Sequence, residues 1–495
     1  MHDKKEAAVC RFFFIMYTLH IVRFKELFTC FLVVTGIMVT IIQKGRVMDL
    51  RRLAGVFLAL ILCLGILPSG ADAASFSDVP KNHWAYDAIM AAEARGLIQG
   101  SDGKFRTGDS VSSQAFLSMV CRAWGLDDRK LESGDRWVEP AMAFGQYAGW
   151  FEEEELTQTS RAKPITREFA AKLLVNALFP EELEQRGAAI RFKDQNEIGW
   201  ARRPYVQAAA RLGLITGYED GTFRPQAPLT RAAAASLLNR ALRMKESGET
   251  GESVQVPILM YHDISYLGSG YSKTPEVFRR QMQELKDAGF HTVTYVQLVD
   301  FVENGTPLPE KPVVISVDDG YRTNYEYMYP ILRELDMRAE IALIGGAVQY
   351  SSWGLKWDEV REMADSGLVS LQAHTDQMHS DQTAEGGRLG VLKAPNESWM
   401  DYVDLLSADT AAVLRKIQRH TGNCPVAFVY PRGKWNPMAD AIVRSAGCKV
   451  SVTTKDGVAK ITRGDSDSLR LMDRIGMDFR NGSVLPVLKQ FGYSE

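Results

Sequence analysis

The 495-residue chain has few cysteines and no marked excess of charge of either sign. Its six cysteines are too few and too scattered for a disulfide framework. We expect Cys121, Cys424 and Cys448 to be small core residues, with a Cys424–Cys448 bridge as the alternative. A net charge of −3, from 58 basic and 61 acidic residues, gives no indication of nucleic-acid binding. The length allows two or three domains with sizeable cores.

The N-terminal region is apolar and has the features of a targeting segment. Residues 55–67 form an apolar run that follows two arginines and precedes the small-x-small tripeptide 71–73, which is the pattern of a secretory signal peptide. A second apolar stretch, 27–42, lies upstream and does not fit a signal that starts at Met1. We therefore expect residues 1–73 to be an N-terminal extension and signal peptide with the true start at Met48. Membrane anchoring by residues 27–42 is the alternative.

Internal repetition follows the targeting segment. The segments 76–106 and 192–225 share a Phe-x-Asp start, a tryptophan, a Gly-Leu-Ile turn and an Asp-Gly-x-Phe-Arg loop, at a separation of about 116 residues. Two periods of about 58 residues imply a degenerate middle unit between them. Each unit is predicted to fold as helix, Gly-rich turn and helix. The expected all-α repeats cover residues 74–130, 131–186 and 187–245, and a polar linker, 246–253, comes after them.

Beyond the linker, apolar runs typical of strands alternate with amphipathic segments such as 275–288 and 408–421. This alternation predicts an α/β domain with a parallel sheet over residues 254–495. The expected strands are 257–261, 291–294, 313–317, 339–344, 368–373, 426–430, 448–453 and 470–475.

Candidate catalytic and metal-ligating residues lie where two of these expected strands end. Asp318 and Asp319 directly follow the strand 313–317, and two adjacent acids are costly to bury unless a cation pairs with them or one of them is held for proton transfer. The strand 368–373 is followed by His374 and, five residues later, His379. On a helix these two side chains would point about 140° apart, so we place them on a loop. Two imidazoles and one carboxylate suit a hydrolytic metal with open coordination positions.

These motifs, in this order, resemble the NodB-type polysaccharide deacetylases, carbohydrate esterase family 4. Residues 316–320 match the family's Thr-Phe-Asp-Asp-Gly block, and 374–379 match its two-histidine block. Residues 430–433 stand at the place of its Arg-x-Pro-x-Gly loop, and 257–263 match its opening, Pro-Ile-Leu-Met-Tyr-His-Asp. The resemblance implies an irregular (β/α) barrel, in which chemistry gathers at the C-terminal ends of the strands.

The resemblance also implies roles for individual residues. Asp319, His374 and His379 would hold a divalent metal, for which we favour Zn²⁺ while other first-row ions stay open. Asp318 would be the general base that acts on a water molecule. The loop residues Tyr430, Pro431 and Gly433 would contact the substrate.

The sequence departs from the family at two places. The late Leu-x-His histidine that serves most members as general acid is absent from 469–475. We choose His262 for this role, as in the poly-N-acetylglucosamine deacetylases that share the Met-Tyr-His-Asp opening. Val429 replaces the loop arginine that would orient the base, and Arg474 or Arg432 could substitute for it.

The repeat region resembles three surface-layer homology (SLH) repeats, by which secreted proteins of Gram-positive bacteria hold secondary cell-wall polysaccharide. The Thr-Arg pairs 166–167 and 230–231 match the family's Thr-Arg-Ala-Glu signature, whereas 111–114 lacks the arginine. Arg167 and Arg231 are candidates for binding acidic sugars, because a guanidinium can meet a carboxylate with two hydrogen bonds. The alternative is that the threonines are plain helix caps with an exposed arginine beside them.

Together these features predict a secreted, metal-dependent N-deacetylase attached to the Gram-positive cell wall or S-layer. Its expected substrate is a glycan that contains N-acetylglucosamine, either peptidoglycan or a surface polysaccharide, and no nucleic-acid partner is expected. Two alternatives stay open. One is a wall-binding structural protein whose deacetylase-like domain is inactive but still grips glycan. The other is an O-acetyl polysaccharide esterase.

Overall fold

The computed structural model describes residues 76–185, 190–246, 251–380 and 387–493. The predicted signal peptide, the start at Met48 and the apolar stretch 27–42 lie outside these residues, as do residues 247–250 of the predicted linker. Within the described ranges, no helix is both long enough and apolar enough to cross a membrane.

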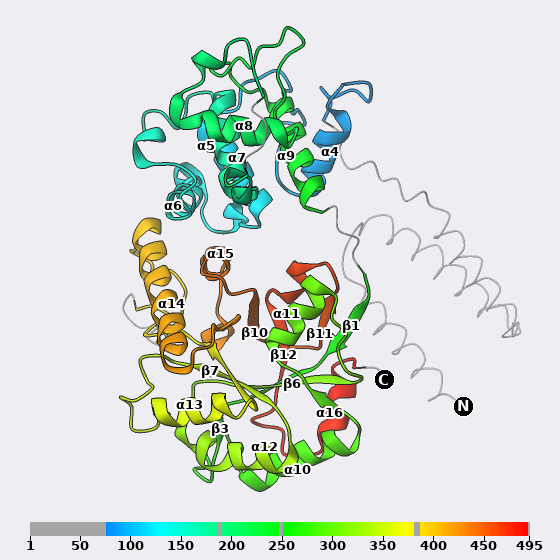
Figure 1. Ribbon diagram of the computed structural model, residues 1–495, viewed down its shortest axis with the longest axis vertical. Helices are drawn as coiled ribbons and strands as arrows, with labels where there is room; N and C mark the ends of the chain where they lie inside the picture. Colours follow the sequence, from blue (N-terminus) through cyan, green and yellow to red (C-terminus); the bar gives the residue numbers. More distant parts are fainter. Residues whose placement is uncertain (1–75, 186–189, 247–250, 381–386, 494–495) are drawn as a thin grey trace, which may run out of the picture. The chain divides into compact units, whose positions relative to one another are not determined.

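The N-terminal part of the described chain, residues 76–185 and 190–246, is built from helices, short 3₁₀ turns and isolated β-bridges. This confirms the predicted all-α class. The α-helices are α4 (Tyr86–Ala94), α5 (Ser113–Trp124), α6 (Glu139–Tyr147), α7 (Arg167–Leu178), α8 (Arg203–Arg211) and α9 (Arg231–Lys245) (Figure 1). Helices α5, α7 and α9 each start with a Ser or Thr N-cap, which satisfies a backbone N–H that has no partner inside the helix.

The three segments that lead into these helices form a ring of backbone hydrogen bonds. Val111 N–H donates to the carbonyl of Leu229, Leu229 N–H to that of Ile165, and Ile165 N–H to that of Val111, at 2.9, 3.0 and 2.9 Å. All three side chains are buried. Three segments far apart in the sequence therefore meet around one point, and Ile165, from the predicted middle unit, takes the same place in the ring as Val111 and Leu229.

The first and last units also repeat a loop in detail. Asp78 accepts the backbone N–H groups of Phe105 and Arg106, at 2.7 and 2.6 Å. Asp194 accepts those of Phe223 and Arg224, both at 2.7 Å. The shared Phe-x-Asp start of the two units is thus the part that holds each unit's own Asp-Gly-x-Phe-Arg loop.

The C-terminal region is a closed barrel of parallel strands (Figure 1). Around the barrel the order is β2 (Ile258–Tyr261), β12 (Met472–Gly476), β10 (Val450–Asp456), β9 (Ala427–Val429), β8 (Val369–Ala373), β7 (Ala339–Leu343) and β6 (Pro312–Val317). Strand β6, at the end of this order, pairs with β2, at its start, and thereby closes the barrel. An eighth strand, β5 (His291–Thr292), pairs with the start of β6. The predicted irregular (β/α) barrel is confirmed, and each expected strand is present within a few residues.

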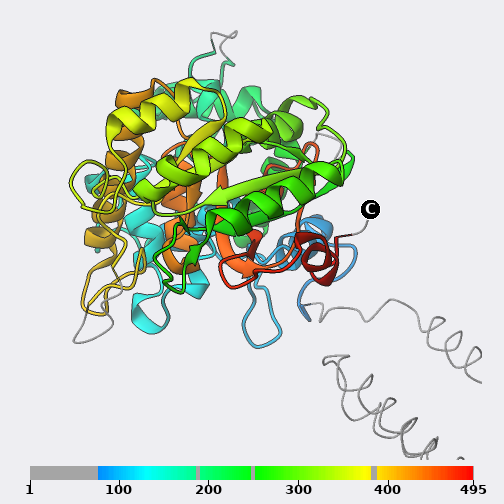
Figure 2. The ribbon, with the colours of Figure 1, turned by 90° about the horizontal axis from the view of Figure 1, so that it is seen from below.

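Helices cover the outside of the barrel: α10 (Pro275–Asp287), α11 (Tyr295–Asn304), α12 (Tyr329–Leu335), α13 (Trp357–Asp365), α14 (Trp399–Thr421), α15 (Pro437–Ser445) and α16 (Val484–Gln490). Helix α10 contacts α12 and α16, and α14 contacts α13 and α15 (Figure 2). Two small sheets lie outside the barrel. One pairs β1 (Ser253–Val256) with β11 (Ala459–Thr462), and the other pairs β3 (Asp263–Ile264) with β4 (Ser272–Lys273).

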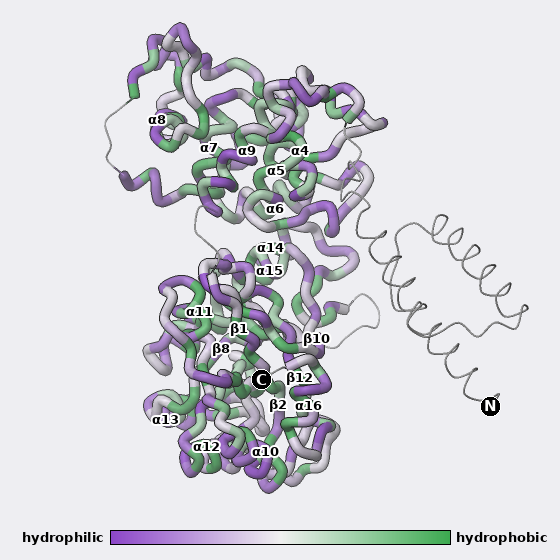
Figure 3. The backbone as a smooth tube through the Cα atoms, turned by 90° about the vertical axis from the view of Figure 1, so that its right-hand side faces the viewer, coloured by the Kyte–Doolittle hydropathy of each residue, from purple (hydrophilic) through white to green (hydrophobic). Residues whose placement is uncertain are grey.

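Apolar side chains fill the space on both sides of the barrel wall. All six residues of β6 are buried, because a parallel strand packs against the barrel interior on one face and against helices on the other. Along the backbone, apolar and polar stretches alternate as expected for elements that bury one face (Figure 3). The described cysteines are free. Cys121 and Cys448 are buried as predicted, whereas Cys424 is exposed in the turn after α14, so the expectation of a core position is wrong for that residue.

Candidate active site

Strand β6 delivers Asp318 and Asp319 to the C-terminal end of the barrel. The Asp318 N–H donates to the carbonyl of Tyr261 at 2.9 Å, so the pairing with β2 extends one residue past the strand. Asp319 (φ 74°) and Gly320 (φ 80°) then turn the chain in the left-handed conformation. A Cβ atom on Gly320 would lie 2.7 Å from Leu343 Cδ2, and the positive φ is unfavourable for other residues, so glycine is favoured where the turn packs against β7.

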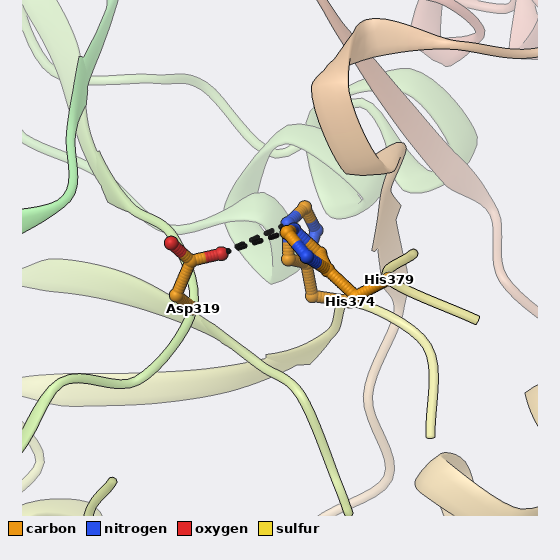
Figure 4. A group of neighbouring side chains, drawn as sticks. All are labelled: Asp319, His374 and His379. Atoms are coloured by element: carbon orange, nitrogen blue, oxygen red, sulfur yellow. Dashed lines mark ion pairs between the residues drawn. The ribbon is translucent and has the colours of Figure 1, made fainter. Parts of the chain in front are cut away.

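Three side chains converge beside this turn (Figure 4). The Oδ1 atom of Asp319 lies 3.4 Å from Nε2 of His374 and 3.3 Å from Nε2 of His379. Nδ1 of His374 lies 2.7 Å from the carbonyl oxygen of Val429. A carbonyl only accepts, so Nδ1 donates to it and Nε2 is the ring nitrogen that faces Asp319. The predicted trio is therefore brought together as expected, with one imidazole already oriented so that Nε2 can serve as a metal ligand.

The chemistry of this donor set fits a divalent cation. The ligand atoms of the three residues all lie within 4.8 Å of one another. Asp319 is 8% exposed, and its Oδ1 atom has no hydrogen-bond partner among the described residues. Burial opposes ionisation, but the two imidazoles hold the pKa of Asp319 well below its ordinary value. An ionised, buried carboxylate oxygen that faces two imidazole nitrogens is the arrangement expected of a site for Zn²⁺ or a related ion.

The loop that carries His379 is held from helix α14. The backbone N–H groups of Asp376 and Gln377 donate to the two carboxylate oxygens of Asp409, at 2.8 and 2.7 Å. Lys416, two helical turns further along α14, forms an ion pair with the Asp376 carboxylate at 2.7 Å. Thr375 lies at φ 71°, which is unfavourable for a β-branched residue and persists only where neighbours fix the backbone. Asp409 and Lys416 supply that support.

Asp318 is paired with the arginine of the last barrel strand. Arg474 donates from Nη1 and Nη2 to the two oxygens of Asp318, at 2.7 and 2.8 Å, and from Nε to the carbonyl of Thr453 at 2.7 Å. Both partners are buried, with exposures of 0% and 2%. Burial alone would raise the pKa of Asp318, but the charge and hydrogen bonds of Arg474 lower it. Of the two arginines considered from the sequence, Arg474 meets Asp318, and Arg432 is exposed.

His262 faces Asp318 from the end of β2. Its Nε2 atom lies 3.9 Å from Asp318 Oδ2, and its Nδ1 atom lies 2.8 Å from Asp478 Oδ2. Burial disfavours the charged ring, but the bond with Asp478 and the charge of Asp318 outweigh it and raise the pKa of His262 to about 9. The Nζ atom of the buried Lys273 donates to the carbonyls of Asp478 and Arg480, both at 3.0 Å, which fixes the segment that carries Asp478.

The loop expected to contact substrate is more buried than the sequence suggested. The side chain of Tyr430 is fully buried, and its hydroxyl donates to Asp440 at 2.8 Å. Pro431 is also buried. A Cβ atom on Gly433 would lie 2.0 Å from Thr454 Oγ1. The Tyr430 hydroxyl is thus engaged with Asp440 and not with the aspartate–histidine trio.

Arg167 and Arg231 hold the loops of neighbouring repeat units. Arg167, at the start of α7, donates to the carbonyls of Phe223 and Thr216, at 2.9 and 2.8 Å. Arg231, at the start of α9, donates to those of Phe105 and Gln99, both at 2.7 Å. Each guanidinium also lies over an aromatic ring of the loop that it holds. Neither arginine is a freely exposed side chain beside a helix cap.

Two residues of the site were missed from the sequence. Asp478 lies two residues beyond β12, so it offered the same signal as Asp318, an acid just past a strand. Asp409 lies inside the long helix α14, where one acid among many gives no signal.

Comparisons with known proteins match this architecture. Residues 305–451 match the family model for polysaccharide deacetylase, and residues 75–112 and 191–235 match the S-layer homology domain. The chain thus carries a polysaccharide deacetylase domain together with S-layer homology domains. The expected middle repeat lies outside the matched ranges and stays a prediction.

Individual relatives share parts of the chain. The poly-β-1,6-N-acetyl-D-glucosamine N-deacetylase of Escherichia coli K12 is 28% identical over 212 residues, which cover 38% of this chain and 32% of the relative. The surface-layer 125 kDa protein of Lysinibacillus sphaericus is 27% identical over 224 residues, which cover 43% of this chain and 18% of the relative. A solved de-N-acetylase from Aggregatibacter actinomycetemcomitans is 27% identical, with a TM-score of 0.42, over 48% of this chain and 100% of that one. The chain thus spans about a third of the length of the Escherichia coli relative.

Proposed function

We propose that the protein is a metal-dependent N-deacetylase of glycan that contains N-acetylglucosamine, attached to the cell wall by its repeat region. One observation carries the proposal. Asp319, His374 and His379 form a ligand set at the same end of the barrel as a buried carboxylate, Asp318, and a histidine, His262, that face each other across 3.9 Å. A hydrolase that cleaves an amide needs a group to accept a proton from water and a group to deliver one to the departing nitrogen.

The ligand set would hold the metal through Asp319 Oδ1 and the Nε2 atoms of His374 and His379. A divalent ion bound there would act as a Lewis acid on the acetyl carbonyl and lower the pKa of a water molecule. Three protein ligands leave coordination positions open for these two groups. Asp409 supports this function indirectly, because it fixes the loop between the two histidines.

Asp318 would accept the proton of the attacking water. Its pKa lies below the ordinary value, so the carboxylate is ionised at neutral pH and able to accept. Arg474 keeps the carboxylate in one orientation through two hydrogen bonds. Pairing with Arg474 makes the Asp318 carboxylate less basic than an unpaired carboxylate buried in the same place would be. It also positions the carboxylate better for proton transfer.

His262 would donate the proton that the departing amine requires. Because the pKa of His262 is about 9, the imidazole is charged at neutral pH and can act as an acid. Water adds to the acetyl carbon, the carbon–nitrogen bond breaks, and the proton from His262 goes to the nitrogen. The products are a glycan that carries a free amine and acetic acid, which releases its proton to become acetate, and the proton taken up by Asp318 restores His262.

These contacts bear on the alternative of an inactive domain. The absence of the late histidine and of the loop arginine was its main support. In the structure His262 contacts Asp478 and Arg474 contacts Asp318, and these contacts support our proposal that His262 and Arg474 substitute for the two missing residues. The observations therefore favour a working site over one that only grips glycan.

The repeat region would attach the enzyme to secondary cell-wall polysaccharide. Its two S-layer homology matches and its similarity to a surface-layer protein support surface attachment after secretion. Arg167 and Arg231 would shape the binding surface by holding the loops between repeat units.

Acetate release tests the catalytic proposal. The full chain, loaded with Zn²⁺, is incubated with oligomers of N-acetylglucosamine, with peptidoglycan and with acetylxylan. We expect acetate from at least one of the N-acetylated glycans, and its loss in Asp318→Asn. The matched control is Asp365→Asn, which changes an exposed aspartate on α13 and should leave the rate unchanged.

Three other results would contradict the proposal. Acetate from acetylxylan alone would assign an O-acetyl esterase. No release from any glycan with Zn²⁺, Co²⁺ or Mn²⁺ would favour the glycan-gripping alternative. Equal release by Asp318→Asn and wild type would remove Asp318 from the role of base.

A further inference from the structure

Two exposed aromatic side chains lie next to the proposed acid. Tyr271 is 53% exposed and Phe479 is 76% exposed, and their ring centroids are 6.1 Å apart. The ring of Tyr271 lies 5.3 Å from the imidazole of His262, measured between centroids. These two side chains, here called the aromatic pair, therefore adjoin the reacting end of the site rather than a remote surface.

The aromatic pair is exposed but firmly anchored. Tyr271 directly precedes β4, which pairs with β3, and its carbonyl accepts the N–H of Asp263 at 3.3 Å. Phe479 lies between Asp478 and Arg480, the two residues whose carbonyls accept from Lys273. Exposed aromatic rings with a fixed backbone, clustered at a functional site, indicate a binding surface.

The barrel order explains why this surface faces the substrate. Strand β2 pairs with β12, so the segments that follow these two strands, 262–271 and 477–480, meet at the same end of the barrel as Asp318. A polymer that places one acetamide group at Asp319, His374 and His379 can extend a neighbouring sugar over this rim.

A pyranose ring has an apolar face made of C–H groups, and an aromatic ring can cover it while the sugar hydroxyls stay in water. We propose that Tyr271 and Phe479 form a subsite that stacks against the sugar next to the one being deacetylated. This inference rests on the proposed function, and it defines the substrate as an oligomer or polymer of hexosamine rather than a free monosaccharide. The aromatic pair then contributes to substrate affinity, while the chemistry stays with Asp318 and His262.

Steady-state kinetics on mono- to hexameric N-acetylglucosamine, β-1,4- and β-1,6-linked, test the subsite. In Tyr271→Ala/Phe479→Ala we expect KM for the tetramer to rise by about tenfold or more, which corresponds to about 1.4 kcal/mol of lost contact energy. Hydrolysis of a small activated acetate ester should be unchanged, because such a substrate does not reach the subsite. Tyr271→Phe/Phe479→Tyr keeps both rings and should keep the wild-type KM. Trp200→Ala, which removes an aromatic side chain that is 83% exposed in the helical region, is the control.

A direct affinity measurement separates the subsite from the activity. The aromatic variants are placed in an Asp318→Asn background and titrated calorimetrically with the tetramer, so that no turnover is needed. Weaker binding in Tyr271→Ala/Phe479→Ala supports the subsite, even for a glycan that is not deacetylated. Equal binding, or no binding by either protein, overturns it.

Three other outcomes would also overturn the inference. An unchanged KM on every oligomer would show that the rings do not contact sugar, while acetate release by wild type would still support the proposed function. An equal fall in the ester rate would mean that the pair supports His262 rather than substrate. Loss of binding to phosphatidylglycerol vesicles with an unchanged KM would assign the rings to a lipid surface.

Discussion

Arg474→Met is the substitution that most directly tests the buried arrangement around Asp318, the proposed base. Methionine resembles arginine in length but carries no charge, so the change removes four hydrogen bonds that Arg474 donates to Asp318, Thr453 and Ser316. Asp318 then stays 2% exposed without its cation. The perturbation is confined to the barrel, because both partners lie inside it.

The expected cost is large because a buried charge loses its partner. Removing one member of a buried ion pair costs about 3–5 kcal/mol. We expect Arg474→Met to lower the free energy of unfolding of the barrel by that amount at pH 7. The double variant with Asp318→Asn should recover a substantial part of the loss, because no uncompensated charge then remains.

The pH dependence has a definite sign. In wild type the folded pKa of Asp318 lies below its unfolded value, so the pair contributes stability above an unfolded pKa of about 3.9, and this contribution is lost as the pH falls through the folded pKa. In Arg474→Met, burial without a cation raises the pKa of Asp318. The difference in the free energy of unfolding between wild type and Arg474→Met should therefore be largest at pH 7 and decrease toward pH 4.

Urea unfolding of the full chain, in the presence of chelator, measures this difference. Hydrogen exchange in peptides from β6 and β12 reports the stability of the barrel separately from that of the helical region. Arg470→Met is the matched control, because it removes an Arg–Asp pair whose carboxylate, on Asp440, is 19% exposed, and we expect a smaller loss. A loss of less than about 1 kcal/mol in the free energy of unfolding of Arg474→Met would refute the reasoning. A loss that does not change with pH and is not reduced by adding Asp318→Asn would refute it as well.

Four further outcomes are expected. His374→Ala should reduce bound metal from about one ion per chain to a small fraction by elemental analysis, and wild-type occupancy would remove it from the ligand set. His262→Ala should lower kcat on amide substrate by roughly 10²–10⁴-fold with metal occupancy intact, but less on an activated ester, and equal losses would contradict its role as acid. Asp478→Asn should lower the pKa of His262 and move the alkaline limb of kcat/KM from about 9 to lower pH, whereas an unmoved limb would assign it to another group. Arg167→Ala with Arg231→Ala should abolish retention on purified walls, and binding that persists equally on polymer-stripped walls would exclude the secondary polymer as the target.

Much of the site was readable because its signals are local in sequence. The apolar run of β6, the two acids behind it and the paired histidines after β8 each lie within a few residues, where apolar runs and turn chemistry are sufficient guides. The same applies to the Phe-x-Asp starts of the repeat units, which proved to hold their own loops through Asp78 and Asp194. The exposed position of Cys424 and the buried side chain of Tyr430 could not be read, because both depend on what packs around them.

The sequence by itself determined the class of the fold, the strands and the candidate metal-binding trio, because each depends on neighbouring residues. Only the tertiary structure decided which distant groups complete the site. Closing the barrel sets β12 beside β2 and β2 beside β6, so Arg474 reaches Asp318 across 156 residues and Asp478 reaches His262 across 216. Strand β9, beside β8, likewise offers the Val429 carbonyl that fixes His374. These pairings follow from the order of strands around the barrel, and that order is set by packing between segments far apart in the chain.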